Sequence, residues 1–378
     1  MEEFEEYIKA TEPSRRERAE NWRMAIGLQA VDGLRTSDYL RETARRNIEG
    51  EITIEEAQTL VRTYYERKTD RTLEDAETEE ADRVAANISR ILSEPSFAFS
   101  VVGLTSIHRR LFEGVFKFAG KIRDYDITKK EWVLRGDTVL YVGADDLRSA
   151  LEYDLQQEKT FSYQNLSMDA TIAHLAAFVS DLWQIHPFGE GNTRTTAVFA
   201  IKYLRSMGFR VDNELFAEHS WYFRNALVRA NYRNRLQNIE PEPIFLVRFF
   251  RNLLLGEQNE LRNRYLLVNP PEEWRGEVER MKAENRTSCE QVPNKLRPSS
   301  ADVAQLIQAI GRDELSVKQM MERMGLKHRP NFIERYLNPA MRDGYVAMRY
   351  PDSPRHPRQK YLLTVKGLAV YNAHLSGE

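Results

Sequence analysis

Two apolar helical runs enclose a short polar stretch, and this arrangement constrains the fold of the chain most. The run over residues 166–185 places its apolar side chains on one helical face. The run that follows the polar stretch begins at Thr195 or Thr196 and ends at Met207. Two runs of this kind predict a pair of buried helices joined by a loop, within a mainly α-helical fold.

The joining stretch, HPFGEGNTRT (residues 186–195), combines groups that suit a phosphate site. Glycines let the backbone approach an anion closely, and free N–H groups at a helix start attract one. Carboxylate oxygens can hold a divalent cation against a phosphate, and histidine can act as a base near neutral pH. The residues concerned are His186, Gly189, Glu190, Gly191, Asn192 and Arg194.

Taken singly, each of these residues is common in structural loops. Packing alone does not require the ordered set. The set therefore indicates a site that transfers a phosphorus-containing group to an acceptor with a removable proton.

Length and composition limit the class of protein. The chain has 378 residues and a formal net charge of −2, which allows two or three domains and argues against a polyanion binder as a whole. No apolar run reaches the roughly 18 residues needed to span a membrane, and the N-terminus shows no signal-peptide pattern. The single cysteine, Cys289, excludes an internal disulfide and predicts a reducing, cytoplasmic setting.

The first 82 residues predict a helical N-terminal region. Thr36 or Ser37 begins a helix that ends at Gly50, and Thr53 begins the next one with Glu56 placed for a capping box. Residues 68–82 are charged, and they predict a linker or an exposed helix. Helical patterning resumes over residues 83–118, where His108 is interpreted as a packing histidine rather than a ligand.

Residues 119–143 differ from their helical surroundings. They alternate apolar and polar positions around a turn at residues 135–137, which predicts a β-hairpin whose edge can pair with an extended partner segment. Helical patterns then continue to residue 256, and some aromatic residues in 216–232 are candidates to stack on a nucleobase.

Residues 257–299 are polar and predict a linker. Residues 300–378 follow the order helix, helix, helix, hairpin, which is typical of a winged-helix domain. Between Arg312 and Lys366 there are twelve Lys/Arg against six Asp/Glu. This local basic excess favours a nucleic-acid partner, and a winged helix used for dimerisation or docking is the alternative.

The loop HPFGEGNTRT resembles the signature of the Fic (filamentation induced by cAMP, Fic/Doc) family, H-P-F-x-[D/E]-G-N-G-R-x-x-R. The upstream stretch SIHRRLFEGVFKFAGKIRDYDI is similar to the helix that leads into the family's flap hairpin. The resemblance covers about residues 85–256. It implies a Fic-type helical catalytic domain over residues 83–256 with a β-hairpin flap. It also implies protein adenylylation, the transfer of AMP from ATP to a target hydroxyl.

The resemblance also implies roles for individual residues. His186 would deprotonate the target hydroxyl, Glu190 would hold Mg²⁺, and Phe188 would anchor the loop. The phosphates of ATP would be bound by Gly189, Gly191, Asn192, Thr193 and Arg194. The flap would dock the target protein at Ile127, Thr128 and Lys129.

The segment YLRETARRNIEGEITIEEA is similar to the family's antitoxin-like inhibitory segment, with Glu49 as the inhibitory glutamate. The chain departs from the family patterns at three positions. Thr193 replaces the third glycine of the signature, Ala197 replaces its second arginine, and Arg45 replaces the inhibitory Ser/Thr. Arg45 or Arg46 could supply the missing charge, and Glu49 could pair with Arg194 or simply end a helix.

The leading hypothesis is therefore a protein adenylyltransferase that an N-terminal helix inhibits. Removal of AMP, transfer of another phosphate-bearing group, and a DNA-binding regulator with a nucleotide-sensing Fic core are the alternatives. The partners admitted are a protein substrate at the flap, DNA at the winged helix and a second copy of the chain. No membrane partner is expected.

Overall fold

The computed structural model describes residues 4–8, 12–69, 72–211, 213–284 and 296–375, and these are mainly α-helical, as predicted. The N-terminal elements are α1 (Glu5–Ile8), α2 (Pro13–Gly27), the 3₁₀ helix η1 (Leu28–Asp32), α3 (Asp38–Glu49), α4 (Ile54–Glu66) and α5 (Leu73–Ser93). Ser37 caps α3, Gly50 ends it in a left-handed conformation, and Thr53 and Glu56 form the predicted capping box of α4. The predicted boundary between residues 82 and 83 lies inside α5.

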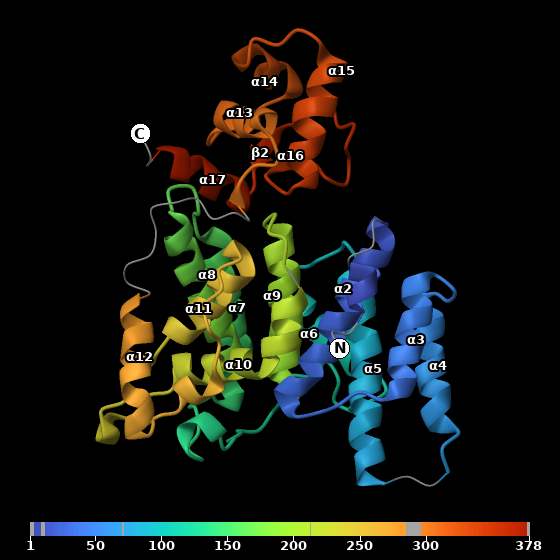
Figure 1. The fold of residues 1–378 in the computed structure, drawn as a ribbon, viewed down its shortest axis with the longest axis vertical. Helices are drawn as coiled ribbons and strands as arrows, with labels where there is room; N and C mark the ends of the chain where they lie inside the picture. Colours follow the sequence, from blue (N-terminus) through green and yellow to red (C-terminus); the bar gives the residue numbers. More distant parts are fainter. Residues whose placement is uncertain (1–3, 9–11, 70–71, 212, 285–295, 376–378) are drawn as a thin grey trace.

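The central elements place the polar loop between α8 and α9. They are α6 (Val101–Leu111), η2 (Trp132–Leu134), η3 (Ala144–Asp146), α7 (Leu147–Thr160), α8 (Met168–Ile185), α9 (Asn192–Ser206), α10 (Asn213–Asn231), η4 (Arg235–Gln237), α11 (Ile244–Leu255), η5 (Asn263–Leu266) and α12 (Glu272–Glu284). Helix α9 runs through the middle of the molecule, between α8 and the N-terminal helices (Figure 1). No described helix is long and apolar enough to cross a bilayer.

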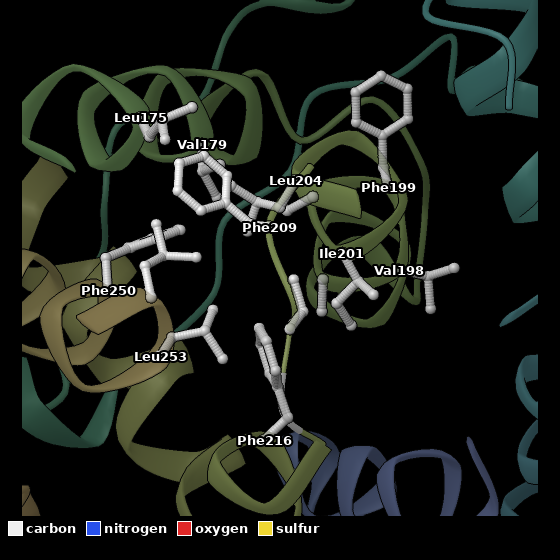
Figure 2. Packing of buried hydrophobic residues seen from close by; sticks show 14 of the residues in the cluster. Leu175, Val179, Val198, Phe199, Ile201, Leu204, Phe209, Phe216, Phe250 and Leu253 are labelled. Atoms are coloured by element: carbon white, nitrogen blue, oxygen red, sulfur yellow. The ribbon is translucent and has the colours of Figure 1, made fainter. Parts of the chain in front are cut away.

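Side chains from four helices and from the chain after α9 pack together in the hydrophobic core. Figure 2 shows Leu175 and Val179 of α8, Ile201 and Leu204 of α9, and Phe250 and Leu253 of α11, gathered near Phe209 and Phe216. These side chains are buried. Burial of apolar area at about 25 cal/mol per Å² fixes α8 and α9, and with them the two ends of the loop.

The C-terminal elements form a separate group at one end of the molecule (Figure 1). They are α13 (Ala301–Ile310), α14 (Val317–Arg323), α15 (Arg329–Phe332), the π-helical turn η7 (Ile333–Leu337), α16 (Asn338–Arg342), β1 (Val346–Met348), β2 (Tyr361–Leu363) and α17 (Val365–Leu375). The strands are antiparallel, with Ala347 opposite Leu362. The helix α13, the helix α14 and the continuous helical run from α15 to α16 precede the hairpin in the order that the sequence predicts, and α17 is an additional helix that was not predicted from the sequence.

The β-hairpin predicted within residues 119–143 is wrong as a strand ladder. In the described part of the chain, named strands occur only at β1 and β2. The segment does reverse direction, around η2, where the Glu131 amide donates to the Asp137 carbonyl at 2.9 Å. Other backbone carbonyls of the segment accept hydrogen bonds from outside a strand ladder. The Arg123 guanidinium donates to the carbonyls of Tyr125 and Val142, and the Val268 amide donates to the Val133 carbonyl. The segment is therefore an irregular flap, and we call residues 119–143 the flap below.

Candidate active site

The polar loop is held at both ends by left-handed residues. His186 ends α8 with a φ of 51°, and Gly191 precedes α9 with a φ of 77°. Between them the Asn192 side chain bonds back to Phe188, accepting from its N–H at 2.9 Å and donating to its carbonyl at 2.7 Å. Helix α9 begins at Asn192, three residues before the predicted start, because Asn192 closes the loop with its side chain while its backbone is already helical.

Both loop glycines are required by close packing. A Cβ on Gly191 would lie 2.2 Å from the Phe112 ring, and one on Gly189 would lie 2.5 Å from the Tyr125 hydroxyl. The loop backbone therefore runs against aromatic side chains, and the N–H groups of the first turn of α9 lie next to it. Such a turn favours an anion, as the sequence predicts.

His186 is a buried neutral base. Its side chain is 3% exposed, and the Tyr141 ring covers it at a centroid distance of 4.2 Å. Burial lowers the pKa of His186 well below 6.5, and the positive charge of Lys129 lowers it further. Nδ1 lies 3.3 Å from the Trp183 carbonyl, which can only accept, so Nδ1 carries the proton. The Nε2 lone pair is thereby left to accept a proton from a substrate.

Arg123 positions the loop from the flap. Its Nε donates to the His186 carbonyl, and its backbone N–H donates to the Pro187 carbonyl, both at 2.9 Å. The same guanidinium bonds the flap carbonyls of Tyr125 and Val142. Flap and loop are therefore joined through one buried side chain.

His108 supports the loop from α6. Its ring stacks on Phe188 at 3.7 Å, which confirms the packing interpretation. The Gly120 N–H donates to Nδ1 at 2.7 Å, so Nε2 carries the proton and donates to the Glu190 carbonyl at 3.0 Å. Burial lowers the pKa of His108 to about 4, which keeps the ring neutral.

Glu190 and Lys129 meet across the site. The Lys129 ammonium lies 2.8 Å from the Glu190 carboxylate. The structure therefore brings together a residue predicted to dock the target protein and a residue predicted to hold Mg²⁺. Ile127 is half-buried and Thr128 is exposed, on the stretch of flap just before Lys129. One carboxylate is enough for Mg²⁺ when substrate phosphates complete its coordination, and the exposed Glu190 fits that role once Lys129 moves.

Arg194 is enclosed by the N-terminal region. Nη2 lies 2.6 Å from Glu80, Nε lies 2.7 Å from Asp32 in an ion pair without hydrogen-bond geometry, and Nη1 donates to Gln29 at 3.0 Å. The guanidinium also lies over the Phe112 ring, 4.9 Å from its centroid. The side chain predicted to bind phosphate thus contacts two carboxylates instead.

The two departures within the family signature, Thr193 and Ala197, have different structural contexts. Thr193 lies in the first turn of α9, where its hydroxyl accepts from the Trp183 indole N–H at 3.0 Å. A β-branched residue is accommodated there because the backbone is helical. Ala197 is fully buried in the next turn of α9, where an arginine would have no open space.

Glu49 does not contact the loop. Its carboxylate accepts from the Tyr7 hydroxyl at the end of α3. Among the described contacts, Arg45 pairs with Glu42 at 2.9 Å and Arg46 with Glu51 at 3.3 Å. The suggestions that Glu49 pairs with Arg194, or that Arg45 or Arg46 supplies the missing charge, are therefore wrong in this structure.

Several residues of the site were not predicted from the sequence. They are Gln29, Asp32, Glu80, Arg123 and Tyr141. A weak signal exists only for Arg123, an arginine within an otherwise alternating stretch. Tyr141 lies in the same stretch without a signal of its own, and Gln29, Asp32 and Glu80 lie in segments without a motif, so only the tertiary fold brings these four residues to the loop.

The model of the Fic/DOC family matches residues 98–204, which include the flap and the loop between α8 and α9. Residues 98–204 form a Fic/DOC domain. Residues 301–364 match a second model, "Filamentation induced by cAMP protein Fic-like, C-terminal domain". Two parts of the chain are therefore recognised, a Fic/DOC domain, as the resemblance implies, and a Fic-like C-terminal domain.

Two curated relatives resemble parts of the chain. "Protein adenylyltransferase VbhT" of Bartonella schoenbuchensis is 26% identical over 114 residues, which are 30% of this chain and 23% of that protein. A "Protein adenylyltransferase" of Bartonella henselae is 22% identical over 185 residues, which are 45% of this chain and 34% of that protein. The chain thus matches only about a quarter to a third of the length of these relatives.

Solved structures give distant matches. A Fic family protein of Desulfovibrio desulfuricans G20 is 20% identical, with 92% of this chain and 87% of that chain covered and a TM-score of 0.38. The N-terminal Fic domain of a Bartonella quintana effector with bound ADP is 21% identical, with 50% and 88% covered and a TM-score of 0.39.

Proposed function

We propose that this Fic-family protein is a protein adenylyltransferase that moves AMP from ATP to a hydroxyl side chain of a target protein. The observation that carries the proposal is the neutral tautomer of His186, whose Nε2 lone pair is left to accept a proton, on the loop that leads into the anion-attracting start of α9. The names of the two relatives support the same activity.

In this proposal the chain's own residues share the work of positioning and charge neutralisation, which phosphoryl-type transfer mostly requires. His186 Nε2 takes the proton of the target hydroxyl as that oxygen attacks the α-phosphorus, and pyrophosphate leaves. The N–H groups at Asn192 and Thr193 and the backbone at Gly189 and Gly191 hold the phosphates. Glu190 and the phosphates would hold Mg²⁺, which would supply charge neutralisation there.

Access requires the flap to move. Tyr141 covers His186, and Lys129 occupies Glu190. A target segment that displaces the stretch from Ile127 to Lys129 would free Glu190, and Tyr141, farther along the flap, would also have to move to uncover His186. The single cysteine suits a reducing compartment, so we place the reaction in the cytoplasm.

We further propose that the N-terminal region inhibits the enzyme through Arg194. Asp32 and Glu80 hold the guanidinium that would otherwise neutralise a phosphate. Ala197 stands where the family signature has its second arginine. Arg194 is therefore the remaining signature arginine that can neutralise a phosphate. Inhibition by Glu49 would need a rearrangement of α3.

The experiment uses the full chain with Mg²⁺ and ATP labelled at the α-phosphate, mixed with cell lysate or alone. His186→Ala should lower protein labelling by about 10²–10⁴-fold. If the wild type and the double variant Asp32→Asn, Glu80→Gln both fail to label any protein, the adenylyltransferase proposal is wrong. Release of AMP from an already adenylylated target would favour the reverse reaction.

A matched set of variants tests the inhibition. Asp32→Asn with Glu80→Gln should raise labelling, whereas Asp38→Asn, whose side chain is 99% exposed, should not. Glu49→Gln separates the two mechanisms. If Glu49→Gln raises labelling and the double variant Asp32→Asn, Glu80→Gln does not, Glu49 is the inhibitory residue and Asp32 and Glu80 have no inhibitory role.

A second candidate function concerns the C-terminal group, which we propose to be a winged helix that binds DNA phosphates. Arg355, Arg358 and Lys360 are all exposed on the loop that joins β1 to β2. Changing all three to glutamine should weaken binding of a DNA duplex by the full chain and reduce its salt dependence. If the wild type does not bind duplex at low salt, this function is excluded.

A further inference from the structure

Arg229 of α10 is a buried cation without a bonding partner. The side chain is 8% exposed, and its Nε and Nη1 atoms are buried and unbonded. Within the described residues no hydrogen bond or ion pair to its guanidinium occurs, and Glu242 acts on it only at longer range. An uncompensated buried charge is costly, so its retention in a packed helix calls for a function.

The same arginine lines a cavity of about 440 Å³. Pockets for small ligands fall in the range of ~300–1,000 Å³. The cavity lies among α10, α11, α12 and the segments 238–242 and 265–270, and it is separate from the loop that carries His186. Part of its wall is apolar, formed by Ile239, Phe245, Leu267 and Val268.

The charges around the cavity restrict the ligand. Glu240, Glu242 and Glu279 also line it, against Arg229 and Arg275. Glu240 is already paired with Arg233 at 2.9 Å. A doubly charged phosphate would be repelled by these carboxylates, whereas a singly charged carboxylate matches the planar guanidinium with two parallel hydrogen bonds.

We propose that this cavity binds a small organic acid, with its carboxylate on Arg229 and its apolar part against Ile239, Phe245 and Leu267. The site lies beside the anchor of the flap. Val268 donates to the Val133 carbonyl at 2.9 Å, and Arg135 donates to the Asn269 carbonyl at 3.3 Å. A ligand in this cavity would therefore stabilise residues 265–270, the segment that holds the tip of the flap.

The test is calorimetric titration of the full chain with hexanoate, with hexanamide as the uncharged probe of the same shape. We expect hexanoate to bind and hexanamide to bind about tenfold or more weakly, since the charge-assisted bonds are lost. Absence of hexanoate binding, or equal binding of both probes, overturns the proposal. Inorganic phosphate that displaces hexanoate overturns the choice of a carboxylate.

Variants add a second measurement. Arg229→Gln should weaken hexanoate binding about tenfold or more, while Arg235→Gln, an exposed arginine on η4, should leave it unchanged. Arg229→Met should raise the Tm of the ligand-free protein, because it removes an uncompensated charge. A large fall in Tm would mean that Arg229 is only structural.

Discussion

At the scale of residues, the protonation of the site follows from what surrounds each histidine. Burial is the main reason that the pKa of His186 lies below its usual value, and Lys129 is the second. Lys129 also neutralises Glu190. One flap lysine therefore adjusts both the proposed base and the proposed metal ligand.

The acid side of the pH profile should report this arrangement. Only unprotonated His186 can accept a proton, so a lowered pKa keeps the enzyme active below pH ~6.5. Lys129→Met removes a positive charge and raises the pKa of His186, so the loss of activity should begin at a higher pH. Labelling rates from pH 5 to 8 measure this. Lys130→Met is the control, and an unchanged profile in Lys129→Met would contradict the assignment.

His108 should make stability depend on pH. Its pKa is about 4 in the folded chain and ~6.5 when unfolded, so only the unfolded chain binds this proton between those values. The free energy of unfolding should therefore fall with pH in that window, by about 2 kcal/mol from pH 7.5 to pH 5.

Urea unfolding of wild type and His108→Gln at both pH values isolates this contribution. The variant should lose about 2 kcal/mol less than the wild type over the same interval. His374→Gln, on an exposed position of α17, is the control and should behave as wild type. Equal losses in all three proteins would show that His108 is protonated in the folded chain.

At the scale of elements, the flap shows where prediction from sequence stops. Alternation and turn residues predicted a turn at residues 135–137, next to the observed reversal around η2, and caps located α3 and α4. The pattern could not reveal that Arg123 and the Val268 amide donate hydrogen bonds to flap carbonyls that a strand ladder would otherwise use. The flap is held by side chains from other elements, which a local pattern does not contain.

One such support is the buried pair of Arg224 on α10 and Glu131 in the flap, at 2.7 and 3.1 Å. Arg224→Met leaves the buried Glu131 carboxylate without its charged partner, with only the Tyr141 hydroxyl at 3.4 Å, and should cost about 3–5 kcal/mol. Amide exchange over residues 129–138 should also become faster, which mass spectrometry can follow.

Arg148→Met is the matched control. Arg148 and Glu152 form an exposed pair at 3.9 Å, and its loss should change stability by less than about 0.5 kcal/mol. Comparable destabilisation by both variants would mean that the buried pair does not hold the flap.

At the scale of the whole molecule, three regions meet at α9. The sequence predicted the loop, its histidine and the order of the C-terminal elements, because these depend on local residues. It could not predict that Gln29, Asp32 and Glu80 surround Arg194, since two separate segments, η1 and α5, supply them. Such long-range pairing decides whether a phosphate-binding arginine is available.

The C-terminal group packs on the end of α9 through backbone contact. Gly208 follows α9 with a φ of 89°, and a Cβ there would lie 2.0 Å from the Gly344 carbonyl oxygen. Nearby, the Lys366 amide donates to the Met207 carbonyl at 3.3 Å, and the Asn372 side chain donates to the Gln164 and Leu166 carbonyls at 3.0 Å.

Gly208→Ala should therefore separate the C-terminal group from the Fic/DOC domain. Gly136→Ala is a close control, since Gly136 has a φ of 90° with no atom near its Cβ position. Left-handed strain alone should cost each variant about 1–2 kcal/mol. Only Gly208→Ala should also increase the radius of gyration in small-angle scattering and speed exchange of the Lys366 amide. If the two variants differ in neither measurement, the glycine contact does not hold the two parts together, and the remaining side-chain bonds do so without it.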